Sequence, residues 1–212
     1  DNQSAVLLGD LLYARAFDLS TRLDSRLASQ VLSKTTQVIC EGEIVQAASR
    51  YDFEMPQEQY EWIAGAKTAA LYRAACELGA TYPGGESPAG RTLGEFGWRI
   101  GLAFQVVDDI LDFTGDASLM GKPIGSDLMS GNITLPAILY MQKNPSNPIQ
   151  HAFEGVRRTS NIKKAIKEIL ADDSIFWEAK NIAREMCDEA RESIDDLPDS
   201  TEKKILLNLV EY

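Results

Sequence analysis

Apolar side chains recur at helical spacing along almost all of this 212-residue chain, and this pattern constrains the fold more than any other feature. Residues three and four positions apart share one face of a helix, so each such repeat predicts an amphipathic helix. No segment alternates apolar and polar residues as a half-buried strand does, and no hairpin signal joins two such segments. A chain of this length can bury one sizeable core. We therefore expect an all-α fold with a single helical domain over residues 1–212.

Capping residues, prolines and glycines divide the chain into the helices that we expect. Ser4 is placed to cap the first of them. The longest irregular stretch, residues 115–132, contains repeated glycines, and long loops inside compact domains tend to be functional. The expected helices cover about residues 4–20, 25–49, 56–80, 88–114, 134–143, 149–156, 161–171, 174–197 and 200–212.

Charge and composition exclude several classes of protein. The formal net charge of -11 argues against nucleic acid or an anionic membrane as a partner. No apolar run approaches the roughly 18 residues of a membrane span, so we expect no transmembrane segment. The three cysteines, Cys40, Cys76 and Cys187, lie far apart and form no paired motif. Sparse, odd cysteines of this kind indicate reduced thiols and predict a cytoplasmic protein.

Three aspartates at the end of an apolar helical run are the sharpest chemical signal. Asp108, Asp109 and Asp112 close the run 101–113, and Asp108 and Asp112 share a face because they are four residues apart. Acids near a helix C-terminus are unfavourable by about 0.3–1 kcal/mol each when exposed, because the helix dipole is negative there. A bound divalent cation reverses this penalty, and Mg²⁺ is usually held by one or two carboxylates together with substrate phosphates.

A second acidic segment with the same spacing provides an internal control. Asp195, Asp196 and Asp199 repeat the pattern, but Pro198 ends the helix inside it. We expect Asp199 to cap the next helix, which makes this copy structural. The first copy differs because apolar neighbours bury its helix and because it leads into a glycine-rich loop with a further acid, Asp127.

Two lysines and one glutamine occupy segments that suit an anion. Lys67 lies among small apolar residues beside Thr68, and it either reaches out to water or forms a sheltered cation aimed at a phosphate. Lys122, between glycines, has the form of a loop cation that can close over an anion. Gln46 is flanked by apolar residues and makes either a core hydrogen bond or a contact to a ligand. Metal and lysines together suit a diphosphate, whose departure leaves a cation that needs an apolar pocket.

Two glycines predict a close contact between helices. Gly97 and Gly101 lie four residues apart within the expected helix 88–114. Each costs up to about 1 kcal/mol in a helix interior, so their presence needs a packing reason. We therefore expect a neighbouring helix to approach this face closely.

Five motifs, in order along the chain, resemble those of the trans-isoprenyl diphosphate synthases, or polyprenyl synthases. The resemblance runs from residue 6 to near the C-terminus. It implies an isoprenoid-synthase-type helical bundle around a central cavity, usually a homodimer. The motifs are Val6-Leu-Leu-Gly9-Asp10, Glu41-Gly-Glu-Ile-Val-Gln46, Lys67-Thr68-Ala, Phe104-Gln105-Val-Val-Asp108-Asp109-Ile-Leu-Asp112, and Gly121-Lys122-Pro-Ile-Gly-Ser-Asp127 followed by Gly131-Asn-Ile-Thr134-Leu-Pro136.

The resemblance implies an (E)-polyprenyl diphosphate synthase, which adds isopentenyl diphosphate head to tail to an allylic diphosphate. By this resemblance Asp108, Asp109 and Asp112 form the second aspartate-rich motif and hold Mg²⁺ on the allylic diphosphate. Lys67 and Lys122 neutralise that diphosphate as it leaves, so these two lysines and Asp108 are the expected catalytic residues. The substrate-lining residues that it implies are Gln46, Lys67, Thr68, Phe104, Gln105 and Lys122.

The sequence departs from the family pattern in one large respect. Family members carry a first aspartate-rich motif, an arginine pair and a basic site for isopentenyl diphosphate upstream of the segment that begins here at Ala5. We therefore expect the C-terminal two-thirds of a polyprenyl synthase without the N-terminal helices, and no condensation by these 212 residues alone. Gly131-Asn132, where short-chain members often have Gly-Lys, resembles medium- and long-chain enzymes.

Two other functions fit part of the pattern. A non-catalytic regulatory subunit of a heteromeric prenyl synthase would share the fold, but it has no need of the acids and lysines. A class I terpene synthase also ionises a diphosphate with metal ions. Its second metal motif is normally of an Asn/Ser/Glu type, unlike the Phe-Gln-x-x-Asp-Asp pattern that ends at Asp109.

Overall fold

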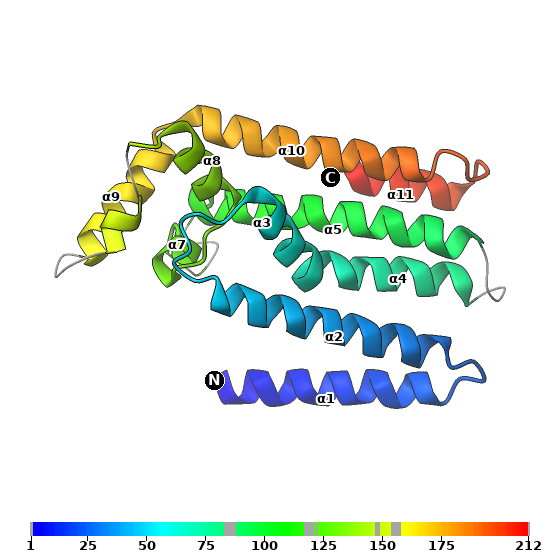
Figure 1. Ribbon diagram of the computed structural model, residues 1–212. Helices are drawn as coiled ribbons and strands as arrows, with labels where there is room; N and C mark the ends of the chain where they lie inside the picture. Colours follow the sequence, from blue (N-terminus) through cyan, green and yellow to red (C-terminus); the bar gives the residue numbers. More distant parts are fainter. Residues whose placement is uncertain are drawn as a thin grey trace.

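The structure is a computed structural model that describes residues 2–82, 88–116, 121, 123–146, 149–153 and 158–211. Within these ranges every regular element is a helix and no residue is in a strand, which confirms the prediction of an all-α fold. The chain runs back and forth along one long axis (Figure 1). The elements are α1 (Asn2–Thr21), α2 (Leu27–Ala48), α3 (Gln57–Ala64), η1 (Gly65–Ala69), α4 (Ala70–Thr81), α5 (Pro88–Thr114), α7 (Ser126–Ser130), α8 (Leu135–Lys143), η2 (Ile149–Phe153), α9 (Arg158–Leu170), α10 (Asp173–Ser193) and α11 (Thr201–Glu211).

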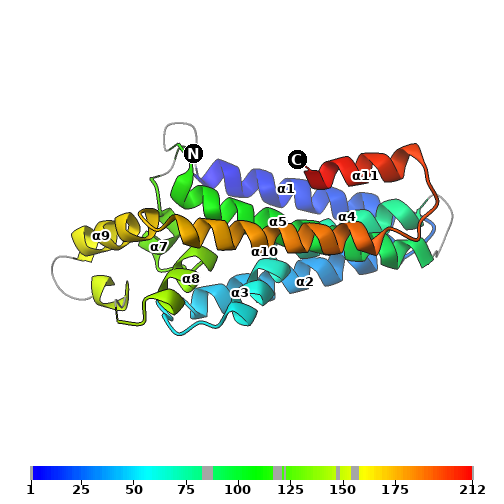
Figure 2. The same ribbon diagram turned by 90° about the horizontal axis from the view of Figure 1, so that it is seen from above.

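Helix α5 is the centre of the bundle. It packs against α4 on one side and α10 on the other, and α7, α8 and α9 gather at one end (Figures 1 and 2). Its side chains Val106, Ile110 and Phe113 are almost fully buried in the main apolar core, and Phe96 belongs to a second cluster with α10 and α11. The acidic end of α5 therefore lies beside the main core, with helices around it.

The glycines of α5 allow α4 and η1 to approach at van der Waals distance. A Cβ atom added at Gly101 would lie 2.5 Å from Cα of Ala69, and one at Gly97 would lie 2.5 Å from the carbonyl oxygen of Tyr72. Real Cβ atoms are not found that close to backbone, so only glycine fits at both positions. The prediction of close helix approach is confirmed, and it is this approach that brings Thr68 within reach of α5.

Several local expectations need correction. The third expected helix is interrupted by η1, a π-helical turn whose wider ring of hydrogen bonds the apolar pattern does not encode; such turns are frequent at functional sites. The glycine-rich stretch contains a short helix, α7, and α1 already begins at Asn2, ahead of Ser4. Helix α10 ends at Ser193, and the hydroxyl of Ser200, not Asp199, accepts from the N–H of Lys203 at the start of α11.

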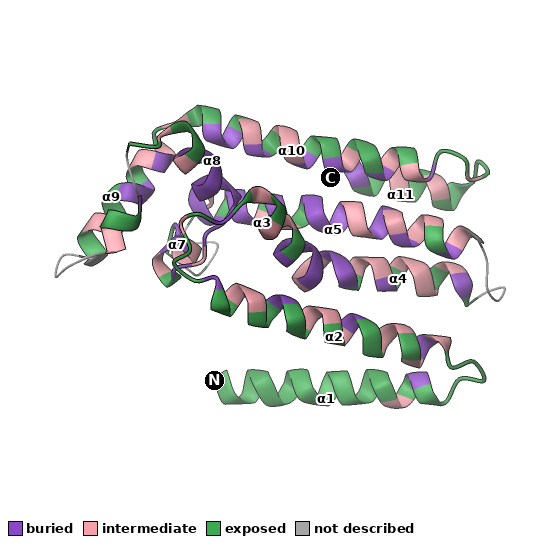
Figure 3. Ribbon diagram, in the orientation of Figure 1, coloured by how far each residue is buried: buried purple, intermediate pink, exposed green. Residues whose placement is uncertain are grey.

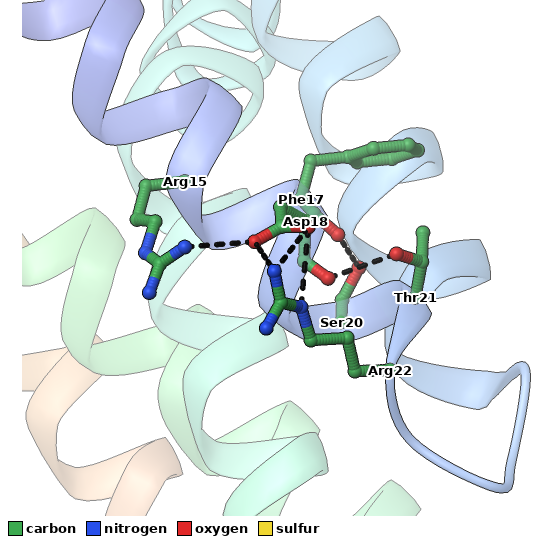
Figure 4. A network of polar contacts seen from close by, with 6 residues as sticks. All are labelled: Arg15, Phe17, Asp18, Ser20, Thr21 and Arg22. Atoms are coloured by element: carbon green, nitrogen blue, oxygen red, sulfur yellow. Dashed lines mark hydrogen bonds and ion pairs between the residues drawn. The ribbon is translucent and has the colours of Figure 1, made fainter.

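Helix α1 packs on α2 but exposes most of its surface (Figure 3). Of its described residues only Ser20 is buried, and its large apolar side chains, among them Val6 and Leu11, face outward. Near the C-terminal end of the helix, Asp18 forms ion pairs with Arg15 and Arg22, each at 2.9 Å (Figure 4). The apolar surface of α1 thus belongs to a regular helix.

The helices and the cysteines of the described residues bear on the expected absence of a membrane span and on the expected reduced thiols. None of the helices in the described ranges is long and apolar enough to cross a membrane. Cys40, Cys76 and Cys187 are all free thiols, in agreement with the prediction of reduced cysteines.

Candidate functional site

A pocket of about 260 Å³ opens between α2, the α3–η1 junction, the acidic end of α5 and the segment that leads into α8. Amide, ammonium and carboxylate groups meet there with the apolar side chains of Met55 and Ile63. The lining of the pocket therefore combines cationic and anionic groups. Its charged and amide-bearing residues are Gln46, Lys67, Gln105, Asp108, Asp109, Asp127 and Asn132.

Lys67 does not reach out to water but is a sheltered cation, the second of the two alternatives that the sequence left open. Its side chain is only 25% exposed, and its Nζ lies 3.2 Å from Oε1 of Glu43. The same ammonium group donates a hydrogen bond to Oε1 of Gln46. Gln46 therefore bonds to the lysine, and both residues line the pocket.

Asp109 lies in the wall of the pocket, where it is 3% exposed. The hydroxyl of Tyr60 donates to its Oδ2 at 2.6 Å, and Nε2 of Gln105 donates to its Oδ1 at 2.9 Å. Burial raises the pKa of the Asp109 carboxyl from 3.8 to about 7, although both hydrogen bonds act in the opposite direction. Both carboxylate oxygens of Asp109 are thus occupied by protein donors.

Tyr60 is a site residue that the sequence analysis missed. It is buried on α3, and burial together with the neighbouring Asp109 raises its pKa well above the usual value, so it stays a neutral hydroxyl donor. The available sequence signal was weak, because a tyrosine at an apolar position of an amphipathic helix most often indicates core packing.

Gln105 connects the acid to the lysine segment. While its Nε2 donates to Asp109, its Oε1 accepts from the hydroxyl of Thr68 at 2.6 Å. Thr68 follows Lys67 directly in η1, so the π turn brings a cation and a hydroxyl to α5 together. Two of the residues implied to line the site are therefore joined by a hydrogen bond.

Asp112 does not line the pocket. Its carboxylate, 2% exposed, accepts from the hydroxyl of Ser126 at 2.7 Å and from the backbone N–H of Asp127 at 3.1 Å. The backbone oxygen of Asp112 also accepts from the N–H of Gly125, which has φ of 67°. Asp112 thereby anchors the first turn of α7.

The three aspartates expected to bind metal are not brought together as one set of ligands. Asp108 and Asp109 line the pocket, whereas Asp112 does not line it and bonds to Ser126. Among the residues that the structure describes, no group of three or more histidines, cysteines, aspartates or glutamates is arranged to hold a metal ion. The pocket is also lined by a fourth acid, Asp127, which lies on α7.

The remaining expected site residues do not line the pocket or lie outside the described part of the chain. Phe104 is 54% exposed and contacts the ring of Tyr72 at a centroid distance of 5.6 Å, outside the residues that line the pocket. Thr68 does not line the pocket directly but reaches it through Gln105. Lys122 lies outside the described residues.

Two buried polar atoms in the pocket have no hydrogen-bond partner among the described residues: Oδ1 of Asn132 and Oγ1 of Thr134. Buried polar atoms in proteins are nearly always paired, so an unpaired set in a pocket marks a place for water or ligand atoms. An amide oxygen and a hydroxyl are suitable partners for the waters that Mg²⁺ retains. The pocket therefore fits a hydrated cation beside Asp108 and Asp127.

The class of protein is therefore an all-α bundle in which acids of the central helix and Lys67 line the same small pocket. The family model described as Polyprenyl synthetase matches residues 1–172. The chain belongs to this family.

Curated relatives and solved structures agree with this assignment. The chain is 35% identical over 211 residues to heptaprenyl diphosphate synthase component 2 of Geobacillus stearothermophilus, covering 100% of this chain and 66% of that protein. It is 31% identical to octaprenyl diphosphate synthase of Escherichia coli, covering 98% and 65%. The chain thus spans slightly less than two thirds of the length of these relatives.

The fold is similar to that of solved members. The heptaprenyl diphosphate synthase of Staphylococcus aureus superposes with a TM-score of 0.89 at 32% identity, over 99% of this chain and 66% of that one. A polyprenyl synthase of Caulobacter crescentus, complexed with calcium and isoprenyl diphosphate, gives 0.87 at 30% identity, over 99% and 65%. The expected isoprenoid-synthase-type bundle is confirmed.

Proposed function

We propose that this chain acts in (E)-polyprenyl diphosphate synthesis, the head-to-tail addition of isopentenyl diphosphate to an allylic diphosphate. The observation that carries the proposal is the pocket in which the sheltered ammonium of Lys67 meets the acids Asp108 and Asp127. A diphosphate needs both cations and metal-bearing carboxylates, and the family assignment supplies the matching chemistry.

Mg²⁺ is the proposed cation. Asp108 is the best-placed of the three expected ligands, because its carboxylate lines the pocket whereas those of Asp109 and Asp112 are engaged by protein donors. Asp127 of α7 would assist, and Asn132 and Thr134 would bond to metal-bound water. When bound, Mg²⁺ supplies neutralising charge to the diphosphate oxygens. The Caulobacter relative, complexed with calcium and isoprenyl diphosphate, supports the proposal of a divalent ion.

In the proposed reaction the bond between the allylic carbon and the diphosphate oxygen breaks, and its electron pair leaves with the diphosphate. Lys67, together with Lys122, would stabilise this leaving group. The alkene of isopentenyl diphosphate attacks the allylic cation, and the new carbon–carbon bond is completed by loss of a proton to the released diphosphate. The role of the chain's own residues in this step is therefore to hold the departing diphosphate.

Isothermal titration with inorganic pyrophosphate tests the binding half of the proposal. We expect binding that requires Mg²⁺ and that weakens about tenfold or more in Asp108→Asn and in Lys67→Ala, since each removes a charged contact. The matched controls are Asp196→Asn, in the second acidic segment, and Lys180→Ala, an exposed lysine of α10; both should bind as the unaltered chain does. Binding without Mg²⁺, or equal losses in the controls, would contradict the proposal.

We also propose a medium- or long-chain product, supported by the heptaprenyl and octaprenyl names of relatives. The 212 residues by themselves are expected to bind pyrophosphate without elongating a prenyl chain. Incubation with radiolabelled isopentenyl diphosphate and an allylic diphosphate checks this, and robust turnover by the chain alone would refute it. The free cysteines support a cytoplasmic location as part of the same proposal.

A homodimer is the proposed assembly, and the outward-facing apolar surface of α1 supports it. A hetero-oligomer is the second candidate, because the Geobacillus relative is named as one component of its enzyme. A purely regulatory subunit remains the alternative function. The sheltered Lys67 and Asp108, which line the same pocket, favour a catalytic role, since such a subunit has no use for these groups.

A further inference from the structure

The indole of Trp98 on α5 packs on the first residue of the π turn η1, the turn that contains Lys67. A Cβ atom added at Gly65 would lie 2.5 Å from Cζ2 and 2.7 Å from Cη2 of Trp98, so the ring occupies the side of Gly65 where a side chain would begin. Gly65 is buried, and its carbonyl oxygen accepts from the N–H of Ala70, five residues later, which is the hydrogen bond of a π turn. The indole therefore contacts the residue at which this wide hydrogen-bonded ring begins.

Trp98 is itself held by charged side chains of three helices. The guanidinium of Arg73 on α4 lies over its ring, 4.6 Å from the centroid. Nη2 of Arg73 lies 2.6 Å from Oε2 of Glu95 on α5, and Oε1 of Glu95 lies 3.0 Å from Nε of Arg99. Arg99 in turn forms an ion pair with Glu189 on α10. The ring that contacts η1 is therefore joined to a network of α4, α5 and α10.

Glycines of two helices contact the rest of the π turn. A Cβ atom added at Gly42 of α2 would lie 2.8 Å from Cβ of Ala66 and 3.1 Å from Cγ of Lys67. Gly101 of α5 contacts the last residue of the turn in the same close manner. The middle and the end of η1 thus pack on glycines, whereas its start packs on the large ring of Trp98.

The direction of the Lys67 side chain depends on the π turn. Such a turn closes its hydrogen bond over five residues instead of four, so it contains one residue more than a turn of α-helix. Each residue of an α-helix turns the chain by about 100°, so relaxation of η1 to an α-helix would rotate Lys67 by about this angle relative to one of the flanking helices. The ammonium group would then lose its hydrogen bond to Gln46 and its ion pair with Glu43.

We propose that Trp98 is a positioning residue for the diphosphate site: its indole holds η1 in the π conformation and thereby keeps the Lys67 ammonium in the pocket. This inference deepens the proposed function and rests on it. Trp98 is not among the residues that line the pocket, so it acts on the diphosphate only through Lys67.

Trp98→Leu is the test variant, and Phe96→Leu is its matched control. Both remove an aromatic ring from α5, but Phe96 is buried in the second apolar cluster, with residues of α10 and α11. The control therefore measures what a loss of aromatic packing in this helix does by itself. Isothermal titration with pyrophosphate and Mg²⁺ is applied to each variant, alone and in combination with Lys67→Ala.

We expect Trp98→Leu to weaken Mg²⁺-dependent pyrophosphate binding about tenfold and Phe96→Leu to change it less than about twofold. In combination with Lys67→Ala, Trp98→Leu should have no further effect, because the group that it positions is already gone. Equal binding by Trp98→Leu and the unaltered chain would overturn the inference, and so would the same loss in the presence and absence of Lys67. Absence of Mg²⁺-dependent binding by the unaltered chain would instead overturn the proposed function.

A measurement without ligand tests the positioning separately. Because Lys67 bonds to Gln46, the ligand-free chain should show a nuclear Overhauser effect between the methylene protons of these two side chains. This signal should be lost in Trp98→Leu and kept in Phe96→Leu. Its persistence in Trp98→Leu would contradict the inference, whether or not the chain binds pyrophosphate.

If Trp98→Leu does not fold, Gly65→Ala replaces it, because the added Cβ displaces the indole from the turn. Gly79→Ala on α4 is the control for this variant, since a Cβ atom there meets no atom within 4 Å. The Overhauser effect between Lys67 and Gln46 should be lost in Gly65→Ala and kept in Gly79→Ala. An unchanged signal in Gly65→Ala would overturn the inference.

Discussion

The hydroxyl of Ser126 donates a 2.7 Å hydrogen bond to the carboxylate of Asp112, 14 residues earlier in the chain. The other oxygen of this carboxylate accepts from the N–H of Asp127 at 3.1 Å. An acid predicted to bind metal therefore fixes the start of α7 and, through it, the position of the pocket acid Asp127. The aspartate-rich motif stabilises the loop as well as supplying a pocket-lining acid.

Asp112→Asn should destabilise the fold by about 2 kcal/mol, because an amide offers only one acceptor to two buried donors. Ser126→Ala should cost about 1 kcal/mol, since it removes one of these bonds. Asp108→Asn should leave stability nearly unchanged while it reduces Mg²⁺-dependent pyrophosphate binding. Urea unfolding measures the stability of the three variants, and isothermal titration measures their Mg²⁺-dependent binding of pyrophosphate. If Asp112→Asn proved as stable as the unaltered chain and lost only metal affinity, the anchoring role would be wrong.

Gly101→Ala should destabilise the protein by about 1–3 kcal/mol, because its Cβ would lie 2.5 Å from Cα of Ala69 and would force η1 away from α5. Gly79→Ala in α4 is the matched control. It meets no atom within 4 Å and should stabilise the helix by up to about 1 kcal/mol. Thermal unfolding compares them, and a neutral Gly101→Ala would show that the two segments can separate freely.

Stability should depend on pH through Asp109. Its pKa is raised to about 7 by burial, whereas in the unfolded chain an aspartate ionises near pH 4. Between these values the folded protein keeps a proton that the unfolded chain has lost. The free energy of unfolding should therefore fall by up to about 1.4 kcal/mol per pH unit as the pH rises from 4 to 7, and level off above 7.

Asp109→Asn removes this titration. Urea unfolding in the presence of EDTA, at several pH values from about 4 to 8, should show the variant gaining stability relative to the unaltered chain as the pH rises. Parallel curves for the two proteins would show that Asp109 ionises normally in the fold.

The apolar surface of α1 should decide oligomeric state. Leu7→Lys combined with Leu11→Lys should convert the proposed dimer to monomer, because two charges would be buried in the interface. Ile205→Lys on α11 is the control, since Ile205 and Leu11 are 61% and 64% exposed. Sedimentation measures the outcome. A dimer that survives the double substitution places the interface elsewhere, and a chain that is monomeric without any substitution contradicts the homodimer.

Local patterns in the sequence were sufficient to predict most of the fold. Periodicity predicted the long helices, and Gly97 with Gly101 predicted close packing, because both depend on residues a few positions apart. The same pattern did not reveal the π turn at Gly65–Ala69, since apolar periodicity does not distinguish a single π turn from a continuous α-helix. Lys67 and Gln46 were recognised as site candidates, but not as partners of one another.

The sequence by itself determined the helical class, the family motifs and the chemical types that meet in the site. Only the tertiary structure decided what each aspartate does. Asp108, Asp109 and Asp112 differ by one and three positions in sequence, yet they face the pocket, its wall and α7. A helix turns by about 100° per residue, so Asp108 and Asp109 point to different surroundings, whereas Asp112 lies one turn beyond Asp108 and meets α7. Those surroundings, Tyr60 and Ser126 among them, come from distant segments whose approach no local pattern specifies.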